Sequence, residues 1–107
     1  MDIVLKAIAE PTRRTILRMI QDTEMTSGDI AAQFSVTRPA ISQHLKFLTE
    51  AGLVSVRRAG TRRLYRARPE GLAEVRGFLE EFWEDSLRRL KAAAEEEERR
   101  KHANAAG

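Results

Sequence analysis

Apolar residues recur at helical spacing in the first fifth of the chain. The segment 2–9 is strongly apolar, and the segment 12–21 carries Ile16 and Ile20 on one side. Pro11 separates the two segments, because the residue before a proline disfavours helix and a proline fits the first turn of a new one. The pattern therefore predicts two short helices, over residues 2–9 and 12–21.

Three arginines lie off the apolar stripe of the second predicted helix. They are Arg13, Arg14 and Arg18. We interpret them as a solvated helix face, with direct contact to nucleic-acid phosphates as the alternative.

Two further helices are predicted around a tight turn at Ser35 and Val36. The first of them opens at Ser27, with Thr26 or Ser27 as N-cap and Asp29 suited to the positive end of the helix. Its expected inward-facing residues are Ile30, Ala31 and Phe34. Two short helices joined in this way are typical of a helix-turn-helix, whose second helix enters the DNA major groove.

The second of these helices has an apolar side and a polar side. Ile41, Leu45 and Leu48 fall at i, i+4 and i+7, while Thr37 is a good N-cap and Gly52 a left-handed C-cap. Its other side carries residues that hydrogen-bond or are positively charged, namely Arg38, Ser42, Gln43 and Lys46. No acidic residue precedes Glu50 in this helix, so we interpret it as a DNA-recognition helix.

Beyond Leu53 the apolar period changes from helical to alternating. Val54 and Val56 begin one strand, a turn follows over 59–61, and 62–67 forms a second strand with Tyr65 as its packing residue. The hairpin carries six arginines and no acid: Arg57, Arg58, Arg62, Arg63, Arg66 and Arg68. We expect the residues near the tip, Arg58 and Arg62 with Arg63, to contact phosphates or the minor groove. The alternative is an ordinary hairpin whose charges prevent edge-to-edge aggregation.

A long amphipathic helix is predicted from about residue 69. Its apolar stripe comprises Leu72, Val75, Leu79, Phe82, Trp83, Leu87 and Leu90. The stripe is longer than the small body needs for its own core, so we expect it to form a dimer interface. The alternative is a ligand box around Phe78, Phe82 and Trp83.

The charged end of the chain is predicted to be an appendage. After Lys91 come three alanines, four glutamates and a basic triplet, which place Glu95 and Arg99 at a favourable i, i+4 spacing. We therefore expect residues 1–91 to form the DNA-binding and dimerisation domain and residues 92–107 a charged helical extension, disordered from 102 onward.

The amino-acid composition excludes several classes of function. Residues 1–68 hold 12 Lys/Arg and 6 Asp/Glu, whereas residues 69–107 hold 7 and 10. A basic body of this kind favours a polyanionic partner. The chain has no cysteine, which excludes disulfides, thiol catalysis and thiolate metal sites. There is no apolar run of the roughly 20 residues that a membrane span needs and no signal-peptide pattern, so we expect a cytoplasmic protein without a membrane partner.

The order of predicted elements is four helices, two strands and a helix, a mainly α fold with a small β-hairpin that is typical of a winged helix-turn-helix. The sequences of 9–17, 38–48 and 50–54, followed by the Arg-Arg-x-Gly-x-Arg wing and Tyr65, resemble the ArsR/SmtB family of bacterial repressors. The Pro-Thr-Arg-Arg opening and the Phe-Trp-Glu-x-x-Leu segment at 82–87 are most similar to its non-metal, SdpR-like autorepressor branch. This resemblance implies a homodimer that occludes a promoter by binding an imperfect palindrome in successive major grooves.

The resemblance also implies roles for particular residues. Arg38, Pro39, Ser42 and Gln43 would face bases, while His44 and Lys46 would contact phosphates or pack. We also count the N-cap residue Thr37 among the DNA-binding residues. The homodimer would be built on the first and last helices, which adds Val4, Leu5 and Ile8 to the stripe of the last helix.

The sequence departs from the family's metal sensors. Thr26 and Gly28 stand where those proteins carry a Cys-x-Cys pair, and the last helix has no histidine before His102. We therefore expect no metal and no cofactor. No phosphate loop and no nucleophile–base set are present, so we expect no enzyme activity. Two alternatives stay open: a sensor responding to an unidentified small-molecule or protein effector, and an interaction module that has lost DNA binding.

Overall fold

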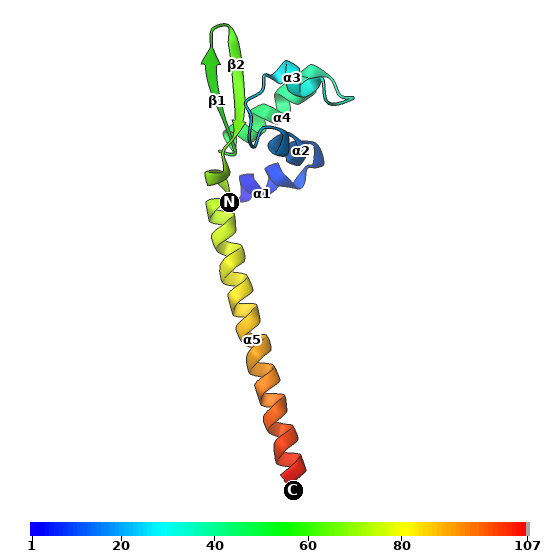
Figure 1. Ribbon diagram of the computed structural model, residues 1–107, viewed down its shortest axis with the longest axis vertical. Helices are drawn as coiled ribbons and strands as arrows, with labels where there is room; N and C mark the ends of the chain where they lie inside the picture. The colour runs from blue at the N-terminus through cyan, green and yellow to red at the C-terminus, as the bar shows by residue number, and fades with distance from the viewer. Residues whose placement is uncertain (107) are drawn as a thin grey trace. The chain divides into compact units, whose positions relative to one another are not determined.

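The computed structural model describes residues 1–106 and contains six helical elements and one β-hairpin. In chain order these are α1 (Asp2–Ala9), α2 (Pro11–Met19), α3 (Ser27–Ala31), α4 (Arg38–Glu50), β1 (Val54–Ala59), β2 (Arg62–Ala67), the 3-10 turn η1 (Pro69–Leu72) and α5 (Ala73–Ala106) (Figure 1). The predicted mainly helical fold with one hairpin is confirmed. The chain divides into two compact units, residues 1–75 and 76–107, which are described separately.

The core of the first unit draws apolar side chains from every helix and from the base of the hairpin. Its fully buried large residues are Ile16, Ile20, Ile30, Ile41, Leu45, Leu48 and Leu53. Each such burial contributes about 1.5–3 kcal/mol relative to an exposed side chain. The three positions predicted as the apolar stripe of α4 are all in this set, whereas Phe34 and Ala31 are only half-buried.

Side-chain caps fix the starts of α3 and α4. The Asp29 backbone N–H donates to Thr26 Oγ1 at 3.1 Å, and Asp29 Oδ2 accepts from the Thr26 N–H at 3.4 Å, which completes a capping box. Thr37 Oγ1 accepts from the Ala40 N–H at 3.3 Å. The caps predicted at Thr26 and Thr37 are therefore confirmed, and α4 begins at a defined residue.

The end of α4 is equally well defined. Gly52 has φ of +78°, a conformation that favours glycine. The Leu53 N–H donates to the Leu48 carbonyl and the Gly52 N–H to the Thr49 carbonyl, both at 3.0 Å. These two bonds form a Schellman motif, which reverses the chain and leads it directly into β1.

The hairpin is antiparallel and is attached to the helices at its base. Val56 pairs with Tyr65, and the tip turns at Gly60, whose φ is +66°. Tyr65 also exchanges two backbone hydrogen bonds with Met25, at 2.8 and 3.1 Å, and the Ala67 N–H donates to the Ile20 carbonyl. In Figure 1 the tip of the hairpin extends beyond α1–α4, so the wing is held at one end only.

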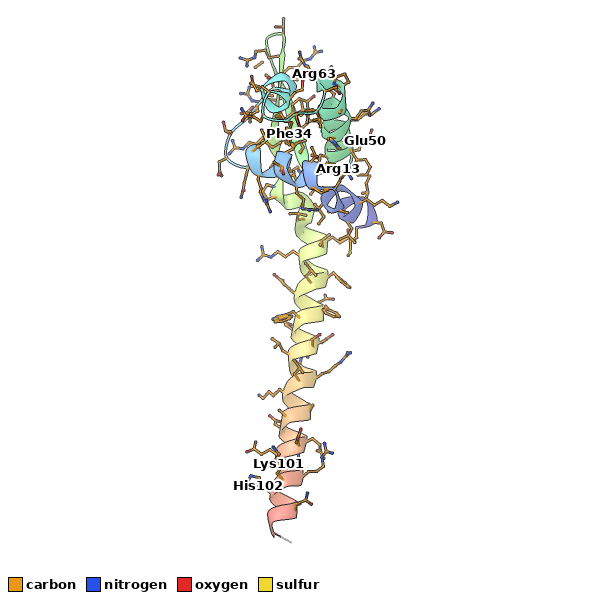
Figure 2. All side chains as sticks on the ribbon, turned by 90° about the vertical axis from the view of Figure 1, so that its right-hand side faces the viewer. Arg13, Phe34, Glu50, Arg63, Lys101 and His102 are labelled. Carbon is orange, nitrogen blue, oxygen red and sulfur yellow. The ribbon has the colours of Figure 1, made fainter. Side chains whose placement is uncertain are left out.

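The second unit consists of the remainder of α5. Ion pairs three or four residues apart run along it, including Arg76–Glu80 at 2.8 Å and Arg99–Glu96 at 2.9 Å. The predicted disorder from residue 102 is wrong up to Ala106, because alanine-rich sequence favours helix and His102 lies 3.8 Å from Glu98 one turn earlier. Figure 2 labels His102 on this continuous helix, while Gly107 lies outside the described residues. No helix in the described part of the chain has the length and apolarity to cross a membrane.

Candidate nucleic-acid interface

The polar side of α4 and the wing face each other across an open groove in the first unit. The groove encloses about 960 Å³. It is lined by α4 side chains, by wing arginines and by the start of α3: Arg38, Ser42, Lys46, Thr49, Glu50, Val56, Arg57, Arg58, Thr61, Arg62, Arg63, Tyr65, Thr26 and Ser27. The structure therefore brings together six of the residues predicted to contact DNA: Arg38, Ser42, Lys46, Arg58, Arg62 and Arg63.

Positive charge dominates this groove, and acidic groups hold part of it in place. Arg57 Nε donates to Glu24 Oε2 at 2.7 Å, and Arg62 Nη2 lies 3.8 Å from Asp29 Oδ2. Arg58 and Arg63 pair across the hairpin and have no acidic partner within residues 1–106. Figure 2 labels Arg63 on the hairpin. Arginines without acidic partners can exchange water for phosphate without first breaking an ion pair.

Arg38 is exposed, and its side chain lies beside Gly28 of α3. Its guanidinium carbon is 3.6 Å from the position that a Cβ on Gly28 would take. A Cβ at Gly28 would stand in ordinary van der Waals contact with the Arg38 side chain, so the two residues are close neighbours. The guanidinium thus covers the position where the resemblance places one thiolate of the metal sensors.

The other predicted α4 positions lie outside the groove. Pro39 and Gln43 are exposed, and Thr37 is the helix cap. His44 lies on another flank of α4, with Nδ1 3.8 Å from Glu10 Oε2 and 3.5 Å from Arg13 Nη1. The ring of His44 is half-buried, so His44 is a packing residue in this structure.

Glu10 is a helix cap with a perturbed acidity. Its carboxylate accepts from the Arg13 backbone N–H at 2.8 Å, at the N-terminus of α2. Desolvation alone would raise the pKa of Glu10. Hydrogen bonds from the backbones of Arg13 and Thr12, together with the nearby His44, outweigh that effect, so the pKa lies below its ordinary value.

Sequence reasoning missed the acidic residues that hold the wing. Glu24 and Arg57 are 33 residues apart in the chain, and no spacing rule links them. Glu24 comes beside Arg57 because it precedes Met25, which pairs with Tyr65 in the hairpin. Such a pairing becomes visible only when the hairpin folds back on the loop before α3.

The expected dimer residues fall into buried and exposed groups. Val4 and Val75 are only 8% and 6% exposed and belong to the core of the first unit, so assigning them to a dimer surface was wrong. The reason is that apolar residues cover most of the surface of α1, and its Val4 side packs inward. Ile3 and Leu5 of α1 are exposed instead, and sequence reasoning missed Ile3. Ile8 and Leu72 are half-buried.

In the second unit the predicted stripe is exposed along its length. Its members are Leu79, Phe82, Trp83, Leu87 and Leu90, with Trp83 63% exposed. The rings of Phe78 and Phe82 stack with centroids 6.3 Å apart. Large apolar side chains left in water over several turns are typical of a protein-contact surface.

No three His, Asp or Glu side chains within residues 1–106 come close enough together to hold a metal ion. Six of the seven charged side chains that line the groove are basic and one, Glu50, is acidic, a balance that suits an extended polyanion.

Comparison with known proteins identifies the family of this chain. The family model described as "Bacterial regulatory protein, arsR family" matches residues 10–56, from the start of α2 into β1. The HTH-type transcriptional regulator Rv2034 of Mycobacterium tuberculosis is 45% identical over 82 residues, 77% of each chain. The transcriptional repressor SdpR of Bacillus subtilis is 47% identical over 60 residues, 56% of this chain and 67% of SdpR.

A solved structure agrees with the fold. It is the homodimeric winged helix-turn-helix DNA-binding domain of Mb0332 from Mycobacterium bovis, with a TM-score of 0.62, 30% identity and 78% coverage of each chain. The matched proteins are transcriptional regulators and not enzymes, which confirms the expectation that this chain is not an enzyme. The chain belongs to the ArsR family of bacterial regulatory proteins.

Proposed function

We propose that this regulator is a homodimeric repressor that binds an imperfect palindrome in a promoter. In this proposal α4 enters the major groove and the wing lies on the flanking backbone or in the minor groove. The observation that carries the proposal is the single groove in which Arg38, Ser42 and Lys46 of α4 meet the wing arginines. A repressor of this kind works in the bacterial cytoplasm, where the chromosome lies.

In this proposal α4 and the wing have different tasks. Arg38 has the fork geometry that pairs bidentately with guanine, and the exposed amide of Gln43 can read adenine. Pro39 and Ser42 would approach the same bases. Lys46 and the wing residues Arg58, Arg62 and Arg63 would contact phosphates, which contribute affinity without sequence preference.

Dimerisation follows from the exposed apolar stripe of α5 together with Leu5 of α1. A twofold dimer presents two copies of α4, and two-fold symmetry in the protein requires a palindromic site in the DNA. The homodimeric relative of the same fold supports this arrangement.

Titration of DNA at two salt concentrations tests the proposal. The probes are a duplex selected from a random library by the protein itself and an unrelated duplex of equal length. We expect the selected duplex to bind more tightly and both affinities to fall steeply with salt, because each neutralised phosphate releases counterions. Binding that is absent or insensitive to salt would support the interaction module instead.

A second candidate function is that of a sensor that responds to a small-molecule effector. It is supported by the stacked and exposed rings of Phe78 and Phe82 beside Trp83. A small apolar molecule bound there would compete with the partner subunit and release DNA. Since Trp83 is the chain's one tryptophan, its fluorescence reports such binding directly. Unchanged emission with a panel of apolar compounds would count against this site.

A further inference from the structure

One side chain connects the first helix of the domain to the recognition helix. Arg13 lies in α2, but its guanidinium reaches both neighbours of that helix. Nη2 donates to the Lys6 carbonyl and Nε to the Ala7 carbonyl, each at 2.8 Å. Figure 2 labels Arg13 among the helices of the first unit. The sequence analysis interpreted Arg13 as part of a solvated helix face, but in the structure its guanidinium contacts α1 and α4 and so joins three helices.

On the α1 side, the guanidinium completes a helix end. The last four carbonyls of a helix have no partner within it, and a cation there also suits the negative end of the helix dipole. Arg13 takes two of these carbonyls in α1. Arg14 takes a third, since its Nη1 donates to the Ile8 carbonyl at 2.7 Å.

On the α4 side, the same guanidinium lies on an aromatic face. Its central carbon is 4.3 Å from the centre of the Phe47 ring, and Nη1 approaches His44 Nδ1 to 3.5 Å. Phe47 lies one turn after Gln43 on the same flank of the helix. Contact at this flank therefore opposes rotation of α4 about its axis, which would move Gln43 and its neighbours off the bases.

The exposed side of α1 carries Asp2 and Lys6, with the apolar side chains of Ile3 and Leu5 exposed on its two flanks. In the homodimer proposed above, this side faces the partner subunit. Arg13 thus lies on a continuous path that runs from the dimer contact through the α1 carbonyls and the guanidinium to Phe47 of α4. Arg14 grips α1 in the same way but makes no hydrogen bond to α4 within residues 1–106.

We propose that Arg13 is a positioning residue that sets where α4 lies relative to the dimer axis, and so sets the spacing between the two half-sites that the dimer accepts. The inference rests on the proposed function, because it needs a dimer that reads two half-sites. Arg13 itself touches no base in this proposal.

The experiment compares matched variants on a set of duplexes. The reference duplex carries the palindrome selected from a random library by the unaltered protein. Two further duplexes add or remove one base pair between the half-sites, and a fourth is unrelated in sequence. The variants are Arg13→Gln, Arg13→Lys and Arg14→Gln, where Arg14→Gln removes the same charge and one α1 cap without touching α4.

We expect Arg13→Gln to lose about tenfold in affinity on the reference duplex, the scale of one misplaced base contact. It should change little on the unrelated duplex, and the three spacings should become more alike. Arg13→Lys should behave like Arg13→Gln, because an ammonium cannot hold two carbonyls and stack on a ring at once. Arg14→Gln should shift all four duplexes by the same small factor.

Equal losses for Arg13→Gln and Arg14→Gln on every duplex would overturn the inference, as would full rescue by Arg13→Lys. If Arg13→Gln does not fold, as judged by circular dichroism, Phe47→Leu decides, since it keeps an apolar side chain and removes only the ring. Phe47→Leu should flatten the spacing preference, and an unchanged preference would overturn the proposal. Failure of the unaltered protein to bind any duplex would overturn the proposed function itself, and that result is read before any variant is made.

Discussion

Gly71 of η1 lies directly against the backbone of Gly52, the residue that ends α4. A Cβ added at Gly71 would overlap the carbonyl oxygen of Gly52 and come within 2.9 Å of its carbonyl carbon. That same carbonyl accepts from Arg68 Nη1 at 3.1 Å. The end of the recognition helix and the start of the last helical segment are thus packed backbone against backbone.

We therefore expect Gly71→Ala to destabilise the domain. The methyl group would meet backbone atoms that cannot rotate away, and overpacking of this kind costs about 1–3 kcal/mol or more. Thermal unfolding followed by circular dichroism measures the change.

Gly77→Ala is the matched control, because a Cβ at Gly77 has no heavy atom within 4 Å. Alanine in a helix is more stable than glycine by about 0.8–1 kcal/mol, so this variant should raise stability or leave it unchanged. A loss of stability of equal size in both variants would show that the contact with Gly52 is not the cause.

Substitutions in the wing should lower the affinity for all DNA, whereas substitutions in α4 should mainly change the sequence preference. Arg62→Ala would remove the phosphate contact proposed above and the ion pair with Asp29, so binding to all sequences should weaken and the salt slope should fall by about 1. Gln43→Ala should mainly relax the preference at one base pair, by about 1–3 kcal/mol.

Fluorescence anisotropy with the selected and the unrelated duplex distinguishes the two effects. Arg89→Ala, an exposed arginine of α5 that does not line the groove, controls for the loss of one charge. If Arg62→Ala and Gln43→Ala lowered the affinity for both duplexes by the same factor, this division of tasks would be wrong.

The cap at Glu10 should make stability depend on acid. Because its pKa is lowered in the folded state, the cap contributes stability above the ordinary pKa of a glutamate and loses it as the pH falls through the folded-state pKa. Glu10→Gln keeps an oxygen that can accept the Arg13 N–H but removes the charge at the start of α2, so it should be less stable than the unaltered protein at pH 7 by about 0.3–1 kcal/mol. The difference should shrink in strong acid.

Urea unfolding at pH 7 and near pH 3 measures this change. Glu81→Gln serves as the control, since Glu81 is exposed on α5 and caps no helix. A destabilisation by Glu10→Gln that stayed constant across this range would mean that ionisation of the carboxylate is not what stabilises α2.

The stripe of α5 should determine the oligomeric state. Leu87→Lys places a charge within the stripe, and a desolvated charge without a partner is costly, so the dimer should dissociate. Glu81→Lys introduces a lysine on the opposite side of the helix and should leave the dimer intact. Sedimentation velocity reports both, and an unaltered dimer in Leu87→Lys would place the interface elsewhere.

Local sequence patterns were sufficient to predict most of the helices and strands of the domain. Thr37 and Gly52 mark the ends of α4 through bonds to residues at most five positions away, so their roles are visible in the sequence. The apolar spacing of Ile41, Leu45 and Leu48 identified the buried side of the same helix correctly. Arg38, Ser42 and Lys46, which line the groove, were predicted from their place off that side, whereas the groove residues Thr49 and Glu50 were missed.

Features that depend on long-range packing were not visible. Apolar residues cover most of the two turns of α1, so the sequence alone could not tell that Val4 packs inward while Leu5 is exposed. Arg13 looked like solvated surface, because its carbonyl partners and Phe47 come together only when three helices pack. The helical tail was missed for another reason: helix propensity and one i, i+4 contact outweighed its small polar residues.

The hairpin has a regular antiparallel register, with Val56 opposite Tyr65 and Arg58 opposite Arg63. The length of the wing therefore changes by a constant amount with each cross-strand pair. Removing one cross-strand pair would shorten the wing by roughly 3.4 Å and turn every side chain beyond it to the other face. Removing two pairs would shorten it further while keeping the arginines on their original faces. Wings of different reach that keep the same DNA-facing surface should therefore differ by two cross-strand pairs at a time.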